Sequence, residues 1–197
     1  MRSLLKSLSS SQARTVTETI DHAQRRLPVG AEIQPGGGVH FRTWAPSARQ
    51  VAVVMAQGVD LTDGVEVPLS PEAGGYWSGW SATARAGMHY RYRLDGNVFP
   101  DPASRFQPQG PHCPSQIIDP EAFAWSDGTW QGVSREGQVL YEMHIGTFTR
   151  EGTWSAAAEQ LPHLADLGVT LLEVMPVADF PGRFGWGYDG VNLYAPT

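Results

Sequence analysis

Short stretches of alternating apolar and polar residues fill the chain from residue 28 to 118, separated by Gly and Pro. The clearest stretch covers residues 88–94, where apolar side chains hold every second position between His and Arg. Side chains of a strand point alternately to its two faces, so this pattern predicts a strand with one buried and one water-facing side. Residues 39–43 repeat the pattern, with His40 and Arg42 on the polar side.

Three further runs complete the predicted sheets. Residues 51–55 are all apolar, which predicts a strand covered on both faces, and residues 65–69 and 76–81 are shorter strand candidates. The spacings of roughly 10–15 residues leave no room for crossover helices, so the pairing should be antiparallel, as in a β-sandwich. The glycines at 36–38 lack the Lys-Ser/Thr pair of a phosphate loop and precede a strand, which indicates a hairpin turn.

Farther along the chain, the pattern predicts a β-α-β unit. Residues 139–148 and 169–174 are apolar runs without strict alternation, typical of parallel strands covered by helices. Between them, Thr153 is a candidate N-cap, and leucines recur at helical spacing until Gly168 closes the helix. Pro162 removes a backbone hydrogen bond inside this stretch, so we expect a kink or a short break there.

Composition excludes several classes of protein. With 41% hydrophobic and 17% charged residues, the 197-residue chain can bury a core, so it is not disordered throughout. The 14 basic and 20 acidic side chains give a net charge of −6, which argues against nucleic-acid partners and anionic membrane surfaces. No run reaches the ~18 apolar residues of a membrane span. We therefore expect uncharged partners.

Cys113 is the only cysteine, so the chain has neither an intramolecular disulfide nor a multi-cysteine metal site. This usage indicates a reducing compartment, and we expect a cytoplasmic protein. The histidines show no metal-ligand spacing, so we expect no metal and no cofactor. Residues 1–27 lack the continuous apolar segment of a secretory signal and are expected to form a flexible tail. The alternative is an amphipathic transit segment in the first fourteen residues, which carry basic and no acidic side chains.

The loop at 175–190 combines aromatic, acidic and glycine residues directly after the second predicted parallel strand. Sites of α/β barrels and open sheets lie at the carboxyl ends of such strands. A sugar ring offers an apolar face to an aromatic side chain and hydroxyls to a carboxylate, so Trp186, Tyr188 and Asp189 are the candidate sugar-binding residues. The alternative is that Trp186 and Tyr188 only pack the loop onto a barrel and that Asp189 forms a turn beside Gly190.

Several motifs, in this order, resemble the α-amylase superfamily, glycoside hydrolase family 13, and within it the malto-oligosyltrehalose trehalohydrolases. They cover about residues 25 to 197 and read Leu27-Pro28-Val29-Gly30-Ala31-Glu32, Phe41-Arg42-Thr43-Trp44-Ala45-Pro46, Tyr141-Glu142-Met143-His144-Ile145-Gly146-Thr147-Phe148-Thr149, Leu161-Pro162-His163-Leu164, Leu167-Gly168-Val169, Glu173-Val174-Met175-Pro176-Val177 and Gly185-Trp186-Gly187-Tyr188-Asp189-Gly190-Val191.

This resemblance implies an immunoglobulin-like sandwich at 28–118, a linker at 119–136 and the start of a (β/α)8 barrel at 137–197. It also implies cleavage of the α-1,4 bond that joins a maltooligosaccharide to a terminal trehalose, with maltooligosyltrehalose as the bound glucan and Tyr188 stacking on the sugar beside the scissile bond. Glycogen branching enzymes open with the same two domains. They usually have Gln at the position of Asp189, which favours the trehalohydrolases.

The family's nucleophile Asp, general acid Glu and stabilising Asp lie on later barrel strands, so no residue of this chain is assigned a catalytic role. A barrel needs ~250 residues, and the part from residue 137 onward provides about a quarter of that. We therefore expect an N-terminal fragment that is inactive by itself. Glu142, His144 and Glu173 are interpreted as a buried polar network of the barrel interior.

A hypothesis of another class remains open beside the enzyme fragment. The sandwich is the part expected to fold alone, and it can act as a non-catalytic α-glucan-binding module. Trp44, Trp77 and Trp80 are its candidate stacking residues. Trp77 and Trp80 are three positions apart and therefore on opposite strand faces, so at least one of them is expected in the core.

Overall fold

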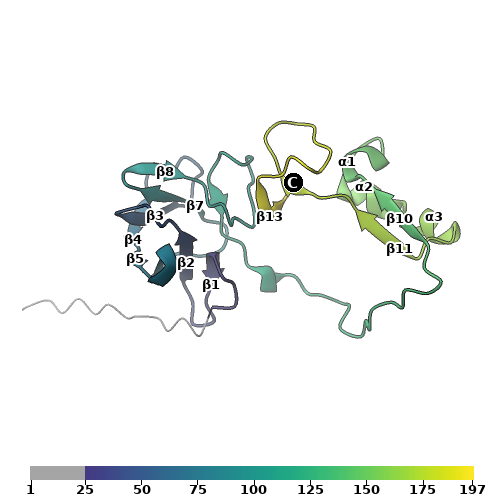
Figure 1. Ribbon diagram of the computed structural model, residues 1–197, viewed down its shortest axis with the longest axis horizontal. Helices are drawn as coiled ribbons and strands as arrows, with labels where there is room; N and C mark the ends of the chain where they lie inside the picture. Colours follow the sequence, from purple (N-terminus) through teal and green to yellow (C-terminus); the bar gives the residue numbers. More distant parts are fainter. Residues whose placement is uncertain (1–24) are drawn as a thin grey trace, which may run out of the picture.

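The computed structural model describes residues 25–197, and most of the expected tail at 1–27 lies outside the described residues. Two lobes follow one another along the chain, an all-β lobe and a smaller α/β lobe, joined by a long segment that carries a short 3-10 helix at Pro120–Ala122 (Figure 1). Among residues 25–197, no helix is both long enough and apolar enough to cross a membrane.

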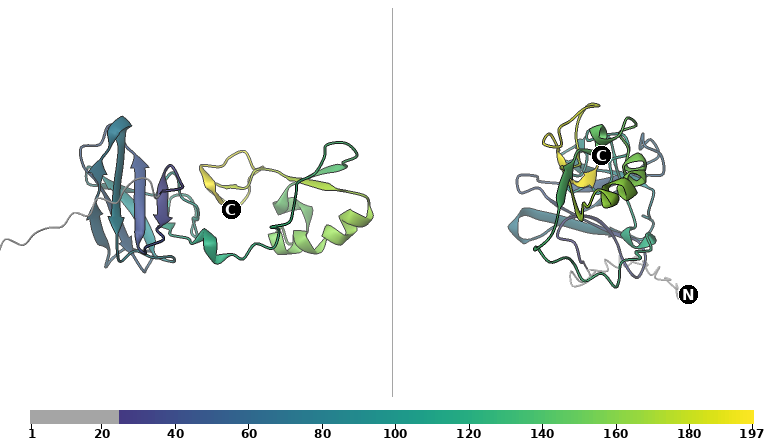
Figure 2. Two further views of the ribbon diagram at one scale, coloured as in Figure 1. Left: turned by 90° about the horizontal axis from the view of Figure 1, so that it is seen from below. Right: turned by 90° about the vertical axis from the view of Figure 1, so that its right-hand side faces the viewer.

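The all-β lobe is a sandwich of two antiparallel sheets, stacked face to face in the side view of Figure 2. One sheet has the order β1-β2-β6-β5, and the other has the order β4-β3-β7-β8 with β9 added to β7. The predicted antiparallel sandwich is thereby confirmed. The strands are β1 (Gly30–Ile33), β2 (Val39–Trp44), β3 (Val51–Ala56), β4 (Val65–Pro68), β5 (Ser70–Pro71), β6 (Tyr76–Ser81), β7 (His89–Leu94), β8 (Asn97–Phe99) and β9 (Ser115–Gln116), with a 3-10 turn at Ala73–Gly75 before β6.

The core lies between the two sheets and is built from the alternating positions of their strands. Phe41 of β2 packs edge-on against Tyr90 of β7 at 5.3 Å between ring centroids, and Tyr90 packs in the same way against Tyr92 at 5.9 Å. All six residues of β3 are buried, as expected for a continuous apolar run. The turn at 36–38 closes the β1–β2 hairpin, with the Gly37 N–H donating to the Gln34 carbonyl at 2.9 Å.

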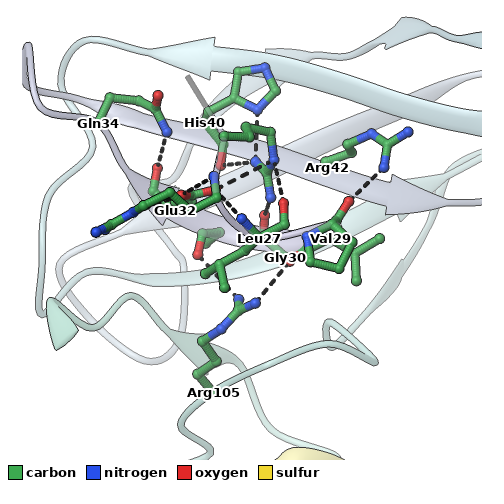
Figure 3. A network of polar contacts seen from close by, with 12 residues as sticks. Leu27, Val29, Gly30, Glu32, Gln34, His40, Arg42 and Arg105 are labelled. Atoms are coloured by element: carbon green, nitrogen blue, oxygen red, sulfur yellow. Dashed lines mark hydrogen bonds and ion pairs between the residues drawn. The ribbon is translucent and has the colours of Figure 1, made fainter. Parts of the chain in front are cut away.

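The polar side of β2 is covered at His40, contrary to the expectation that it faces water. His40 is buried because Arg25 lies over it, donating from Nη1 to His40 Nδ1 at 2.8 Å and to the His40 carbonyl at 2.9 Å. Glu32 on the neighbouring β1 is also buried, 3.6 Å from Arg25 Nε, and burial lowers the pKa of Arg25. Figure 3 shows the polar contacts around Glu32 and His40. Strand periodicity identifies a face, whereas the residues that cross that face decide whether water reaches it.

The α/β lobe begins with the predicted β-α-β unit. Strand β10 (Leu140–Met143) pairs in parallel with β11 (Leu171–Val174), and the helices α1 (Ile145–Phe148), α2 (Trp154–Glu159) and α3 (Leu161–Asp166) lie between them in the chain. The Thr153 hydroxyl accepts the Ala156 N–H at 3.2 Å, so the predicted N-cap is confirmed. The predicted break near Pro162 is also confirmed, because α2 and α3 are separated at Gln160.

One strand of this lobe is shorter than predicted. In the run at 139–148, the strand ends at Met143, and the last four residues form the helical turn α1. The His144 carbonyl accepts from the N–H groups of Thr147 and Phe148, at 3.1 and 2.9 Å, instead of from a neighbouring strand. Apolar character alone does not distinguish a short buried strand from a helical turn.

A two-stranded antiparallel hairpin ends the described chain. It consists of β12 (Ala178–Asp179) and β13 (Asn192–Pro196), and it lies between the sandwich and the β10–β11 pair (Figures 1 and 2). The residues between its strands form a wide loop, drawn in yellow in Figure 1, which contains the predicted sugar-binding residues.

Candidate functional site

The candidate site is the loop at 180–191, which we call the aromatic loop. Its ends are held together by the hairpin, in which Asp179 and Asn192 are register partners and the Val191 N–H donates to the Asp179 carbonyl at 2.9 Å. The Thr197 N–H donates to the Val177 carbonyl at 2.8 Å and extends this pairing. The loop therefore leaves and returns to one fixed base, next to the carboxyl end of β11.

Two glycines allow the aromatic loop to fold back on the segment after β11. A Cβ on Gly187 would lie 2.5 Å from the Pro176 carbonyl oxygen, and its φ of +92° is in the left-handed region. A Cβ on Gly190 would lie 2.5 Å from Ala178 Cβ. Both distances are shorter than any side chain tolerates, so the close approach of loop and strand end requires glycine at these positions.

His144 supports the aromatic loop from the end of β10. Its Nε2 lies 2.8 Å from the Gly185 carbonyl oxygen. Because a carbonyl only accepts, Nε2 carries the hydrogen and Nδ1 is free to accept, which fits the Thr147 hydroxyl at 3.4 Å. His144 is half-buried and acts here as a donor to the loop backbone.

The three predicted sugar-binding side chains are all exposed on the aromatic loop. Trp186 and Tyr188 have 78% and 70% of their surface exposed, and Asp189 is exposed as well. None of the three side chains makes a hydrogen bond with another described residue. Their polar atoms and ring faces are therefore accessible to a ligand, and the sugar-binding role stays a prediction.

The base of the loop is buried against the sandwich. Asn192 is 4% exposed, and its side-chain Nδ2 donates to the Asp101 carbonyl at 3.3 Å. Asp179 is buried beside it, and burial raises the pKa of its carboxyl, partly offset by the Phe180 N–H and by His112. Sequence inspection did not single out Asn192 or Asp101, because nothing in their spacing relates the two residues.

The polar residues of the β10–β11 pair differ from the expected buried network. Glu142 and Glu173 are register partners on the two parallel strands, and both are exposed. The prediction was wrong for these two carboxylates: among residues 25–197, β10 and β11 form a two-stranded sheet, and no barrel closes around their side chains. Among residues 25–197, no group of three or more His, Cys, Asp or Glu side chains is arranged to hold a metal ion.

A second aromatic surface lies on the outer face of the sandwich. Trp44 is 60% exposed and is the register partner of Tyr76, over whose ring Arg42 stacks at 3.9 Å. Trp80 lies on the same face, opposite His40. Trp77 instead packs against the core, as expected for one of the pair, and its Nε1 donates to the Ala45 carbonyl. Tyr76 was missed, although the alternation of β6 places it beside Trp44.

Comparison with known proteins connects both lobes to enzymes that act on glucans. Residues 28–110 match the family model of carbohydrate-binding module 48, the isoamylase N-terminal domain. Malto-oligosyltrehalose trehalohydrolases from Deinococcus radiodurans and Saccharolobus solfataricus are 44% and 45% identical to the chain over 87% and 80% of its length. The chain spans 27% of the length of each relative. A 1,4-alpha-glucan branching enzyme from Xanthomonas euvesicatoria is 35% identical over 81% of the chain.

Solved structures agree with these relatives. An alpha-amylase candidate from Salmonella typhimurium superposes with a TM-score of 0.78 at 44% identity, over 86% of this chain and 28% of its own. A pullulanase from Paenibacillus barengoltzii has a TM-score of 0.69 at 23% identity, over 85% of this chain and 31% of its own, which supports the fold alone. The resemblance to the N-terminal part of the trehalohydrolases is confirmed, as is the fold, a sandwich followed by part of an α-amylase barrel.

Proposed function

We propose that this chain, which matches the N-terminal quarter of malto-oligosyltrehalose trehalohydrolases, contributes the sandwich and one wall of the sugar site to a glycosidase of that type. The reaction would cleave the α-1,4 bond next to the terminal trehalose of maltooligosyltrehalose and release trehalose. The observation that carries the proposal is the 44–45% identity to these enzymes over most of the chain. The free Cys113 is consistent with a cytoplasmic enzyme.

The aromatic loop fits the binding of a neutral, hydroxylated ligand. Tyr188 presents an open ring on which a glucose unit can stack, and Trp186 presents a second one. The Asp189 carboxylate can accept hydrogen bonds from sugar hydroxyls without competition from other described residues. The support from His144 and the hairpin holds the backbone in place, which lowers the entropy lost on binding.

Bond cleavage in this type of enzyme requires carboxylates that the resemblance assigns to later barrel strands. A retaining glycosidase places its two carboxyl groups ~5 Å apart across the scissile bond, one ionised and one protonated. Glu142 and Glu173 are register partners on adjacent strands, and both are exposed to water. We therefore expect residues 1–197 to bind a glucan end and not to hydrolyse it alone.

A chimera tests the proposed reaction. Residues 25–197 replace the matching segment of the Deinococcus radiodurans relative, and trehalose release from maltooligosyltrehalose is measured. We expect the chimera to release trehalose. Tyr188→Ala should lower the rate of release at least tenfold, because it removes one stacking contact worth about 1.4 kcal/mol. A folded chimera without trehalose release, or one indifferent to Tyr188→Ala, would contradict the proposal.

A matched chimera separates the nearest enzymatic alternative. The same residues replace the matching segment of the Xanthomonas euvesicatoria branching enzyme, and the formation of α-1,6 branch points in amylose is measured. We expect little branching, because Asp189 stands where those enzymes usually have Gln. Branching at the level of the parent enzyme, together with no trehalose release from the first chimera, would favour the branching-enzyme function.

The outer face of the sandwich supports a second candidate function, glucan binding without catalysis. Trp44 and Tyr76 lie side by side, and Trp80 is four strand positions away, ~13 Å along the sheet. Titration of the 197-residue chain with maltoheptaose, followed by tryptophan fluorescence, tests this function. A response that Trp44→Ala abolishes and Tyr188→Ala leaves intact would assign binding to the sandwich, and the reverse would assign it to the aromatic loop.

A further inference from the structure

We infer that Asn192 is a positioning residue through which the sandwich holds the aromatic loop in place. The inference rests on the proposed sugar-binding function of that loop, and it gives the sandwich a mechanical role in the site that is separate from any glucan binding of its own. The contact that carries it is the hydrogen bond from Asn192 Nδ2 to the Asp101 carbonyl.

Asp101 is a rigid acceptor because all its polar groups are occupied. Its N–H donates to the Ser115 hydroxyl at 3.1 Å, and its carboxylate accepts from the Ala103 N–H at 2.8 Å and from the Tyr90 hydroxyl at 2.7 Å. Its carbonyl accepts the Ser104 N–H at 3.0 Å besides the Asn192 amide. With 0% of its surface exposed, Asp101 cannot move without breaking contacts in the sandwich.

Tyr90 connects Asp101 to the centre of the sandwich. Its ring is buried between Phe41 and Tyr92, so the hydroxyl that binds Asp101 is fixed by packing from both sheets. Because side chains in a protein core are closely packed, a displacement of one side chain is transmitted to its neighbours. The Asn192 side chain is therefore bonded to a point that is as immobile as the sandwich core.

Asn192 is also the first residue of β13 and the register partner of Asp179, at the point where the aromatic loop closes. When the two ends of a loop are fixed to each other, the residues between them can adopt fewer conformations. His144 holds the other side of the loop at the Gly185 carbonyl. The aromatic loop is thus held at two points, one on each lobe.

Two variants with the same chemical change test the role of Asn192. The chain contains only two asparagines, Asn192 and the exposed Asn97 of β8. Asn192→Asp keeps the side-chain shape, removes the donor and places a carboxylate against the Asp101 carbonyl, and Asn97→Asp is the matched control. Amide hydrogen exchange in the whole 197-residue chain reports the aromatic loop and the sandwich separately.

We expect Asn192→Asp to accelerate exchange in the hairpin and loop at 178–192 by about tenfold, the loss of one buried hydrogen bond. Exchange at Tyr90 and Tyr92 should stay within about twofold of wild type, and Asn97→Asp should leave both regions unchanged. Unchanged exchange in the loop would overturn the inference. Equal acceleration in loop and sandwich would also overturn it, because Asn192 would then serve general stability.

A sugar titration of the same proteins relates the contact to binding. We expect Asn192→Asp to weaken binding of maltoheptaose at least threefold, with Asn192→Gln, which retains a donor, closer to wild type. Accelerated loop exchange with unaltered sugar affinity would overturn the positioning role. If wild-type chain and Tyr188→Ala bind sugar equally, the proposed function of the loop fails, whereas the exchange experiment still decides whether the sandwich holds the loop.

Discussion

The buried carboxyl of Asp101 makes the stability of the sandwich depend on pH. Burial raises its pKa from 3.8 to about 6, and the hydrogen bonds from Ala103 and Tyr90 and the charges of Arg105 and Arg25 offset only part of that effect. At neutral pH the fold therefore encloses a carboxylate that would be better solvated in the unfolded chain.

The sign and size of the effect follow from the two pKa values. Because the folded pKa of Asp101 is the higher one, the protonated acid is the form that the fold favours. Its contribution is complete below pH 3.8 and is lost as the pH rises through about 6. A difference of about two pKa units corresponds to about 3 kcal/mol, most of which is lost between pH 4 and pH 7.

Asp101→Asn removes this dependence while keeping the shape of the side chain. The amide oxygen can still accept the Ala103 N–H, and the amide nitrogen can donate to the Tyr90 hydroxyl oxygen, which both donates and accepts. Urea unfolding at pH 4 and pH 7, followed by near-ultraviolet circular dichroism, gives the free energy of unfolding of each protein.

Between pH 4 and pH 7, we expect wild type to lose about 2–3 kcal/mol more than Asp101→Asn. Asp63→Asn, a change at an exposed loop carboxylate, is the matched control and should follow wild type. If wild type and Asp101→Asn lose the same amount, burial of Asp101 does not impose the cost described above, and the reasoning is refuted.

Two further predictions concern the aromatic loop. Gly187→Ala places a Cβ 2.5 Å from the Pro176 carbonyl oxygen at a φ of +92° and should displace the loop, at a cost in local stability of ~1–3 kcal/mol. The loop should then be cleaved faster by a protease, and resistance to proteolysis equal to wild type would contradict this. His144→Ala removes the donor to the loop backbone and should weaken maltoheptaose binding several-fold, and His144→Gln, which keeps a donor, should restore part of the affinity. If wild type and His144→Ala bind maltoheptaose with equal affinity, this hydrogen bond does not contribute to binding.

Most of the sandwich could be predicted from local sequence. The alternation at 88–94 and 39–43, the apolar run at 51–55 and the glycine turn at 36–38 each correspond to an observed element, because period-2 burial and turn chemistry act over a few residues. The N-cap at Thr153 was predictable for the same reason.

The errors arose where the surroundings of a strand decide the outcome. His40 holds a polar position of its strand and is nevertheless buried, because Arg25, fifteen residues away in the chain, lies over it. Glu142 and Glu173 were expected inside a barrel, and they are exposed because β10 and β11 form a sheet of two strands among residues 25–197. Neither result follows from the pattern within the strand itself.

For the candidate site, the sequence alone determined that an aromatic loop follows a parallel strand, and it predicted Trp186, Tyr188 and Asp189 in that loop as sugar-binding residues. Only the tertiary structure decided what holds that loop, because the donor Asn192 and the acceptor Asp101 are 91 residues apart. Such a contact depends on how two lobes meet. It produces no periodicity or spacing in the sequence, because two residues far apart in the chain meet only when the fold brings them together.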